Sequence, residues 1–341
     1  ELVAGRGLAL MRGVPVARYS SWQVCAVFYG MGAHLGWTCP QNARGHVLGH
    51  VKDLGDDPND PATRFYTTCA AQPFHTDSAD IVGLLCINNS AEGGESQVVS
   101  SAAIWNELVR TKPSLAKILT QPFPVDRKGE VPPGKKPTYD MPIFHRHSGR
   151  GLQGCTTGKH AEKAARSEAM GKQSEVAARE GAEEREEYTM SNRSDEGARE
   201  KGEAGDAMLL SGIYDRNFIS SAQVRYSAAD GVPRLTAGQL EALDALDALC
   251  HDPGLRLDMR LEPGDIQWLH NHTTLHARSA YSDGGPALSR RHLLRLWITP
   301  PNARPLPAIF AERFGTVEVG PARGGIRVDG QTPYCALEPG A

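Results

Sequence analysis

The sequence predicts a single α/β domain over residues 1–341 with a mainly β core. Short apolar or alternating runs, which are typical of strands, recur along the chain. A few stretches between them have the periodicity of amphipathic helices. One long charged segment interrupts this pattern. Together these features indicate one layered domain that carries an insertion, which accounts for a length above that of a typical domain.

Three segments are predicted to be helices. Residues 20–34 form an amphipathic stretch, and Ser101 is expected to cap a helix that ends near Arg110. Thr236 and Gln239 have the spacing of a capping box. The helix that they open carries a leucine at every third position, and we expect this stripe to pack against a sheet: Leu240, Leu243, Leu246 and Leu249.

Other segments have the features of strands. Residues 81–87 and 98–99 are apolar and are expected to be buried strands. Residues 255–261 alternate Leu or Met with polar side chains, which is typical of a half-buried strand. Residues 124–156 are rich in Gly, Pro and Lys, so we expect a loop there that acts as a lid and includes His145 and His147.

A low-complexity, disordered insertion is predicted over residues 156–206. Residues 161–206 contain 13 acidic and 8 basic side chains, and Val176 is their only branched aliphatic residue. Such a segment cannot bury enough apolar surface to offset the entropy of ordering. A surface insertion is the simpler interpretation, and a protein-docking arm is the alternative.

The composition narrows the classes of partner. The net charge is −3 and no basic stripe is visible, so we expect a small-molecule partner and no nucleic acid. No apolar run approaches the roughly 20 residues that span a bilayer, so no membrane is expected. The seven cysteines are scattered and form no C-x-x-C pair, which favours a reducing compartment, the cytoplasm. Because the chain opens at Glu1, an organelle-targeting segment stays an alternative. Assembly into a homo-oligomer stays open as well.

A histidine and an aspartate have the spacing of metal ligands. His75 and Asp77 are two positions apart, and residues i and i+2 of an extended segment point to the same face. Two histidines and one carboxylate make the facial triad of non-haem Fe(II) oxygenases, which leaves adjacent coordination positions open. His276 is well placed to complete the set. If its stretch is extended, His270 and His272 share its face, so alternation does not exclude them.

Two arginines lie on an otherwise apolar segment, residues 291–298. If this segment is extended, Arg291 and Arg295 share one face and lie about 13 Å apart, at about 3.3 Å per residue. Burying an unpaired cation is costly, and the planar guanidinium suits a carboxylate. Two inward arginines therefore predict two anionic groups in the pocket.

Five segments carry a family resemblance: residues 74–77, 93–96, 263–265, 271–278 and 291–297. Through them the chain resembles the taurine dioxygenase-like (TauD/TfdA) family of Fe(II)- and 2-oxoglutarate-dependent oxygenases. The resemblance implies a double-stranded β-helix, the cupin-like jelly roll, with flanking helices. It also implies Fe(II), 2-oxoglutarate and dioxygen as cofactor and co-substrates. Decarboxylation of 2-oxoglutarate to succinate and CO2 would be coupled to hydroxylation of a small anionic organic substrate.

The resemblance also implies roles for particular residues. The iron ligands would be His75, Asp77 and His276. Arg291 would pair with the far carboxylate of 2-oxoglutarate, and Ser96 would donate a hydrogen bond to it. Arg295 matches a position that holds an anionic substrate group in some relatives. Arg290 and Arg295 remain rivals of Arg291 for the 2-oxoglutarate role.

Arg278 and Asn271 lie close to His276 in sequence and are expected to support the ligands without binding the metal. Two other classes of protein remain. A zinc hydrolase could use the same three ligands but needs no arginine for 2-oxoglutarate. A jelly-roll binding protein without catalytic activity would be free to lose any of these residues.

Overall fold

The computed structural model describes residues 1–58, 60, 63–149, 208–284 and 290–338. The insertion predicted over residues 156–206 lies outside the described residues. Among the described helices, none combines the length and the apolar character needed to cross a bilayer. These helices are α1 (Ser21–Leu35), α2 (Ser101–Thr111), α3 (Pro113–Ile118), α5 (Arg216–Arg225), α6 (Ala237–Cys250) and α7 (Ala311–Phe314), with 3₁₀ turns η1 (Val16–Arg18), η2 (Phe65–Thr67), η4 (Ala228–Asp230) and η6 (Ala308–Phe310).

Two predominantly antiparallel sheets form the core, and the pair β17–β3 in the larger one is parallel. The larger has the order β1-β13-β5-β16-β3-β17, with β2 also paired to β16, and the smaller has the order β12-β7-β14-β4. Three two-stranded pairs, β10-β11, β15-β6 and β8-β9, lie outside these sheets. The strand bounds are β1 (Leu8–Met11), β2 (Trp37–Thr38), β3 (His46–Val51), β4 (Gln72–His75), β5 (Ile81–Asn88), β6 (Glu92–Gly93), β7 (Ser96–Ser100), β8 (Phe123–Asp126), β9 (Thr138–Met141), β10 (Phe144–Ser148), β11 (Met208–Gly212), β12 (Arg256–Met259), β13 (Ile266–His270), β14 (Thr274–Arg278), β15 (Tyr281–Ser282), β16 (His292–Thr299) and β17 (Tyr334–Cys335).

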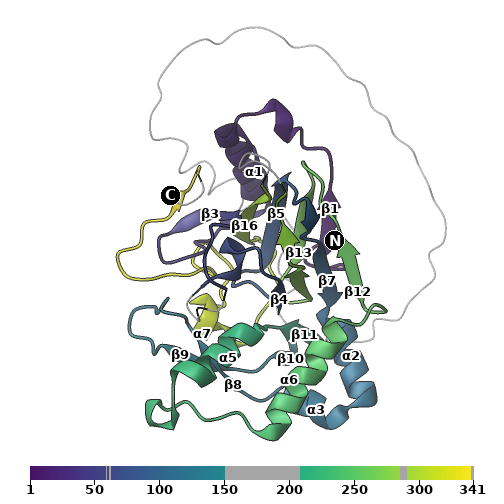
Figure 1. Cartoon of the computed structure of the whole chain (residues 1–341). Helices are drawn as coiled ribbons and strands as arrows, with labels where there is room; N and C mark the ends of the chain where they lie inside the picture. The colour runs from purple at the N-terminus through teal and green to yellow at the C-terminus, as the bar shows by residue number, and fades with distance from the viewer. Residues whose placement is uncertain (59, 61–62, 150–207, 285–289, 339–341) are drawn as a thin grey trace, which may run out of the picture. The chain divides into compact units, whose positions relative to one another are not determined.

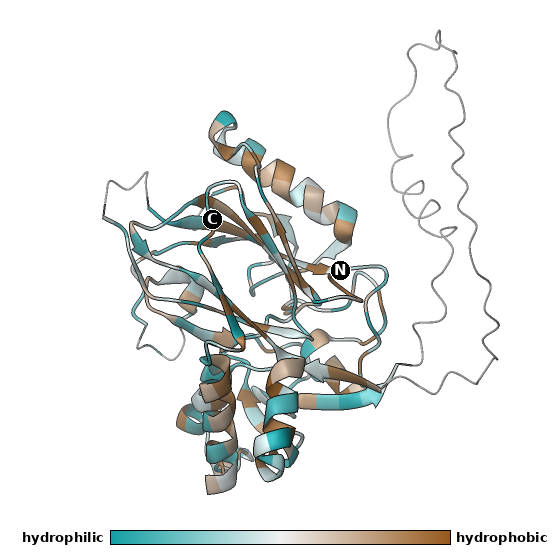
Figure 2. Cartoon of the chain, turned by 90° about the vertical axis from the view of Figure 1, so that its right-hand side faces the viewer, coloured by the Kyte–Doolittle hydropathy of each residue, from teal (hydrophilic) through white to brown (hydrophobic). Residues whose placement is uncertain are grey.

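The two sheets pack face to face, as the predicted jelly roll requires. Val82, Leu269 and Trp297 of the larger sheet share one buried cluster with Val98 of the smaller sheet. Figure 2 shows these strands as largely apolar, between α1 on one side and a group of helices on the other. The predicted mainly β core with flanking helices is confirmed.

Helix α1 covers the outer face of the larger sheet (Figure 1). Ser20 and Gln23 form a capping box at its start, and Phe28 packs against alternate residues of β16. Those residues are Leu294, Leu296 and Ile298, the face of β16 opposite the arginines. The predicted alternation along this strand is therefore present.

Helix α6 begins at the predicted capping box, but its leucine stripe is not uniformly buried. The helix contacts α3 and α2. Its buried leucines share a core cluster with Phe74 of β4, Val99 of β7 and Leu275 of β14. Leu243 and Leu246 are fully buried, whereas Leu240 is 43% exposed. Three residues turn a helix by about 300°, so a strict three-residue repeat drifts around it and cannot stay on one face. Alanines and a cysteine complete the buried face: Ala242, Ala245 and Cys250.

Two smaller predictions are corrected at the ends of elements. Ser100 caps α2 by accepting a hydrogen bond from the Ala103 N–H, and Ser101 is the first helical residue. The half-buried strand at 255–261 is shorter than predicted, because β12 ends at Met259. Leu257 in it is 49% exposed, since β12 lies at the edge of its sheet and pairs with β7 alone.

The described part of segment 124–156 contains strands as well as a loop, so the loop prediction was wrong for the strands. Residues 127–137 connect β8 to β9 outside any strand, and Lys128 in this connection lines a cavity together with His75 and Asp77. The strands β8 and β9 form a hairpin whose side chains join the core around Phe123 and Met141. Strand β10 then pairs with β11 and carries His145 and His147. His145 is buried, and His147 Nε2 lies 2.9 Å from Ser211 Oγ.

A buried ion pair fixes the segment that follows His75. Asp80 and Arg323 are both completely buried, and Arg323 donates to Asp80 Oδ1. His272 Nε2 lies 2.9 Å from the same oxygen. Burial alone would raise the pKa of Asp80, but His272 and Arg323 hold this pKa below its usual value. The C-terminal part of the chain therefore anchors the loop that carries Asp77.

Replacing Arg323 by Met should lower the free energy of unfolding by about 3–5 kcal/mol, because Asp80 would remain as a buried carboxylate without its cation. Urea unfolding measures this change. Arg110→Met is the control, since Arg110 is exposed and pairs with Glu107 on the surface of α2. The two variants should differ clearly in their midpoints, and equal midpoints would contradict a structural role for the Asp80–Arg323 pair.

Candidate active site

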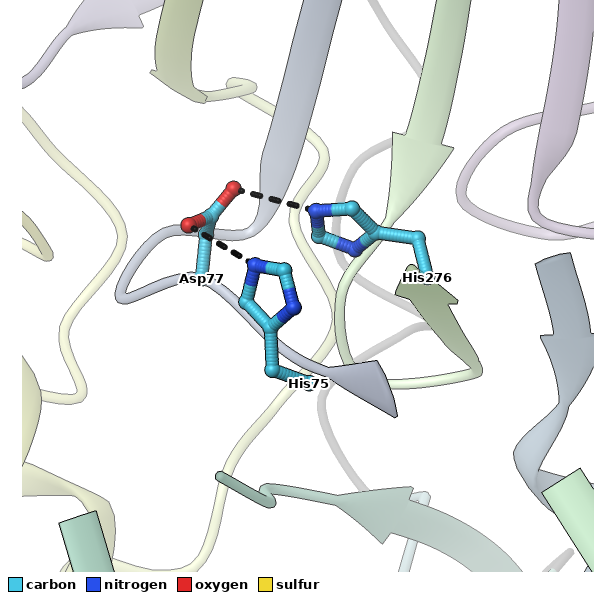
Figure 3. Close-up of side chains that lie close together, drawn as sticks. All are labelled: His75, Asp77 and His276. Atoms are coloured by element: carbon cyan, nitrogen blue, oxygen red, sulfur yellow. Dashed lines mark ion pairs between the residues drawn. The ribbon is translucent and has the colours of Figure 1, made fainter. Parts of the chain in front are cut away.

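Strand pairing brings the three predicted metal ligands together. His75 ends β4, and the register of β4 against β14 sets it directly opposite His276. Asp77 lies in the loop that follows, and its Oδ1 is 3.9 Å from His75 Nε2. Its Oδ2 is 3.5 Å from His276 Nε2. All three side chains are buried and point toward one another, with one donor atom of each within 4.8 Å of the others (Figure 3).

The protonation of these groups suits a metal ion. His75 Nδ1 lies 2.9 Å from the Pro73 carbonyl oxygen, so Nδ1 carries the proton and Nε2 offers its lone pair. Burial, with the neighbouring His75, lowers the pKa of His276 to about 3, so this imidazole is neutral at ordinary pH. Burial would raise the pKa of Asp77, but Arg295 and the two histidines hold it below its usual value. The neutral imidazole of His276 therefore faces the carboxylate of Asp77 beside His75.

Asn271 holds the loop of Asp77 in place. Its Oδ1 accepts a hydrogen bond from the Asp77 N–H at 3.0 Å, and its Nδ2 donates to the Ala79 carbonyl oxygen at 2.9 Å. Its own N–H donates to the Asp80 carbonyl oxygen at 2.8 Å. One buried side chain thus fixes the backbone on both sides of Ser78.

The chain turns at residues 271–273, so the stretch from 266 to 278 is not one extended strand. Strand β13 belongs to the larger sheet and β14 to the smaller. His270 Nδ1 lies 3.0 Å from Thr273 Oγ1, and His272 bonds Asp80. The common face that kept His270 and His272 open as ligands does not exist. Among the described residues, His276 alone of the three joins His75 and Asp77 in a metal-ligand cluster.

Two cavities adjoin the triad, and the one called here the second cavity contains buried cations with unused hydrogen-bond donors. Arg278 and Arg291 line it together with Ser96, His75 and His276. The Nε and Nη1 atoms of both arginines are buried and have no hydrogen-bond partner in the described part of the chain. Because a buried cation is costly without an anion, this cavity fits a ligand carboxylate.

Tyr281 lies between the two arginines, and sequence analysis missed it. The guanidinium carbons of Arg278 and Arg291 are 4.8 and 5.1 Å from the centre of its ring. Burial, with repulsion from Arg291, lowers the pKa of Arg278 to about 10, and burial also lowers the pKa of Arg291. Ser96 donates a hydrogen bond to Gln267 Oε1 at 2.8 Å in the same cavity. No motif signals Tyr281, because its position depends on the short pairing of β15 with β6.

Arg290 and Arg295, the alternatives to Arg291 for binding 2-oxoglutarate, have different surroundings. Arg290 is exposed at the surface. Arg295 is buried, donates to Gln41 Oε1 at 2.7 Å and has its Nη1 3.5 Å from Asp77 Oδ1. Its guanidinium carbon is also 4.8 Å from the centre of the Tyr66 ring. Arg295 therefore already has protein partners, whereas Arg291 has unused donors.

Arg278 and Asn271 were both predicted to support the metal ligands, but they have different hydrogen-bond partners. Asn271 binds the metal-site loop directly. Arg278 instead donates to the carbonyl oxygens of Thr68 and Ala70 and lines the second cavity. Of these two residues, only Asn271 hydrogen-bonds a predicted metal ligand, through the backbone N–H of Asp77.

Comparisons with known proteins agree with this site. The model of the family described as "Taurine catabolism dioxygenase TauD, TfdA family" matches residues 1–196 and 207–297. The chain belongs to the TauD/TfdA family. It is 30% identical to FR-33289 synthase of Streptomyces rubellomurinus, over 92% of this chain and 76% of that protein. It is 24% identical to a taurine hydroxylase-like protein of Stachybotrys chartarum, over 86% of this chain and 63% of that protein.

Solved structures of the non-heme iron oxygenase OrfP share the fold. A variant in complex with (3S)-hydroxy-L-Arg superposes with a TM-score of 0.51 at 12% identity, over 95% of this chain and 81% of that chain. OrfP with Fe and alpha-ketoglutaric acid gives 0.50 at 13% identity, over 86% and 76%.

As a member of the TauD/TfdA family, the chain is an Fe(II)- and 2-oxoglutarate-dependent dioxygenase. The alternatives of a zinc hydrolase and of a binding protein without activity do not agree with this assignment.

Asn271→Ala should weaken metal binding by about 10–100-fold, as losses of ligand-supporting hydrogen bonds do, because the loop of Asp77 is freed on both sides. Anaerobic titration with Mn(II) or Fe(II) by calorimetry measures the dissociation constant. Asn42→Ala is the control, because Asn42 Oδ1 also accepts two backbone N–H groups, those of Arg44 and His46, in another turn. Equal metal affinities in the two variants would show that Asn271 does not position the site.

Proposed function

We propose that this dioxygenase binds Fe(II) through His75, Asp77 and His276, and 2-oxoglutarate through Arg291. With these groups it hydroxylates a small anionic organic molecule. The observation that carries the proposal is the pair of buried arginines with unused donors in a cavity that also touches His75 and His276. A zinc hydrolase with the same three ligands has no need of such a cavity.

The three ligands suit Fe(II) because they occupy one side of the ion and leave the other side open. When bound, iron and 2-oxoglutarate would allow dioxygen to act as the oxidant: one oxygen atom would enter succinate as 2-oxoglutarate loses CO2, and the other would enter the hydroxylated substrate. The protein contributes a fixed geometry. Asp77 stays ionised and His276 stays neutral, so both are ready to bind a cation without first exchanging a proton.

Arg291 is proposed to hold the far carboxylate of 2-oxoglutarate. Its Nη2 donates to the Gly94 carbonyl oxygen at 3.3 Å, which orients the guanidinium while Nε and Nη1 stay available. Arg278 adds a second positive charge to the same cavity, and Ser96 adds a hydroxyl. Apolar side chains complete the walls and exclude water around the ion pair: Val51, Leu84, Leu261 and Leu293.

The organic substrate is proposed to occupy the cavity on the other side of Asp77. That cavity is lined by Thr76, Asp77, Arg295 and Trp297 among others. We propose that Arg295 contacts the substrate there, close to the metal ligand that it already approaches. A small anionic molecule fits this setting better than a nucleic acid.

The six described cysteines are free thiols, which supports a reducing compartment such as the cytoplasm.

The test uses metal-free protein under anaerobic conditions, to which Fe(II) and then 2-oxoglutarate are added. The complex should give a weak visible charge-transfer band, and His75→Ala should abolish it. Arg291→Met should weaken 2-oxoglutarate binding about 100-fold, because truncating a buried charge partner costs about 3 kcal/mol.

Arg290→Met is the matched control, since this neighbouring arginine is exposed. It should leave the affinity for 2-oxoglutarate unchanged. A band that forms equally in wild-type protein and Arg291→Met would contradict the proposed role of Arg291. The absence of a band in protein that demonstrably binds Fe(II) would contradict the proposed function itself.

A further inference from the structure

We propose that the substrate carries an oxyanion head group with more than one negative charge, of the phosphate or phosphonate class. Arg64, Lys128 and Arg313 would bind this group in the cavity beside Asp77. The proposal deepens the proposed function and rests on it, because it assumes that this cavity holds the substrate. The three cations are separate from the arginines that the family resemblance singled out.

The three cations come from distant parts of the chain and converge on one aromatic ring. Arg64 precedes η2, Lys128 lies between β8 and β9, and Arg313 is in α7. Their charged ends lie 5.0, 5.1 and 5.5 Å from the centre of the Phe218 ring. All three line the cavity that His75 and Asp77 also line. The ring favours each of the three cations, and their common cavity makes all three available to a ligand bound there.

Only one of the three cations has an ion-pair partner in the described part of the chain. Arg64 pairs with Glu130. Within the described ranges, neither Lys128 nor Arg313 forms an ion pair, and Arg313 Nε donates only to Ser78 Oγ, at 2.6 Å. The lining carboxylates are Asp77, which faces the two histidines and Arg295, and Asp215, which caps α5 and also attracts Lys128. These two carboxylates face four lining cations: Arg64, Lys128, Arg295 and Arg313. Positive charge is therefore in excess on the substrate side, before any metal ion is added.

The backbone at Lys128 is held in an uncommon conformation. Lys128 has φ 49°, and among the described residues it is the only non-glycine with a positive φ. Asp126 Oδ1 accepts the Lys128 N–H at 2.8 Å and so supports this turn. Such conformations cost free energy in a non-glycine residue and concentrate at ligand-binding sites. A glycine would adopt the turn without strain, so the lysine side chain is the feature that needs a function.

The number and geometry of the donors indicate the ligand. One arginine satisfies a carboxylate through two parallel hydrogen bonds. A tetrahedral group with three terminal oxygens and up to two negative charges can engage two guanidinium forks and one ammonium at once. Three cations with few carboxylate partners therefore favour a phosphate or phosphonate group over a carboxylate. A sulfonate, with one charge, would bind less tightly.

The test compares three small probes that differ in the anionic group: methylphosphonate, methanesulfonate and acetate. Each is titrated by calorimetry into anaerobic protein that holds Fe(II) and saturating 2-oxoglutarate, so that the arginines of the second cavity are occupied. Methylphosphonate should bind at least about tenfold more tightly than acetate. Lys128→Gln should weaken methylphosphonate binding about tenfold, the effect of one charge-assisted hydrogen bond.

Lys135→Gln is the matched control, because Lys135 lies in the same hairpin but pairs with Glu312 outside the cavity. It should leave methylphosphonate binding unchanged. Arg313→Gln is the second variant, in case Lys128→Gln disturbs the turn, and it should also weaken binding about tenfold. Circular dichroism shows whether each variant is folded.

Two results would overturn the inference: equal affinity for acetate and methylphosphonate, or unchanged methylphosphonate binding in folded Lys128→Gln and Arg313→Gln. The visible band of the Fe(II)–2-oxoglutarate complex, recorded before any probe is added, tests the proposed function separately. Calorimetry reports probe binding whether or not that band forms, so failure of one proposal is distinguished from failure of the other.

Discussion

The site depends on how Asn271 joins the two sheets to the loop between them. The chain leaves the larger sheet at the end of β13, turns at residues 271–273 and enters the smaller sheet as β14. At that turn, Asn271 binds the backbone of Asp77 and Ala79. The position of the carboxylate is therefore tied to the strand that carries His276. If one sheet shifted against the other, the Asp77 carboxylate would move as a unit with His276.

A second feature is the arrangement of positive charge around the triad. Arg278 and Arg291 lie in one cavity, Arg295 borders Asp77, and Arg64, Lys128 and Arg313 lie in the other. Aromatic rings support both groups, Tyr281 in the first and Phe218 in the second. Buried cations without anions lower the stability of the folded protein, and anionic ligands that bind only the folded state restore it. An anionic ligand that pairs with these cations therefore binds more tightly, because it removes the free-energy penalty of burying them.

Much of the metal site could be predicted from local sequence. The two-residue spacing of His75 and Asp77 has a direct geometric meaning on an extended segment, and alternation along β16 set Arg291 and Arg295 on one face. The choice of His276 was different. It came from the family resemblance, because local alternation treated His270 and His272 as equals. The turn at 271–273 is what separates these two histidines from His276 in the structure. Strand pairing between β4 and β14, which no local pattern encodes, sets His276 opposite His75.

The remaining features depend on contacts between distant segments. Leu240 is exposed because α6 packs on helices whose positions the leucine pattern does not contain. The segment predicted as a loop from residue 124 also contains strands, since composition alone does not reveal that Phe123 and Met141 enter the core. Arg64, Lys128 and Arg313 belong to no motif and meet only through the fold around Phe218.

The central claim is that His75, Asp77 and His276 hold iron while Arg291 holds the far carboxylate of 2-oxoglutarate. Anomalous diffraction at the iron edge, from crystals grown anaerobically with Fe(II) and 2-oxoglutarate, tests it most directly. We expect one iron peak between the three side chains, and density for 2-oxoglutarate that runs from the metal to Arg291. An iron peak elsewhere, or a far carboxylate bound to Arg295 instead of Arg291, would contradict this account.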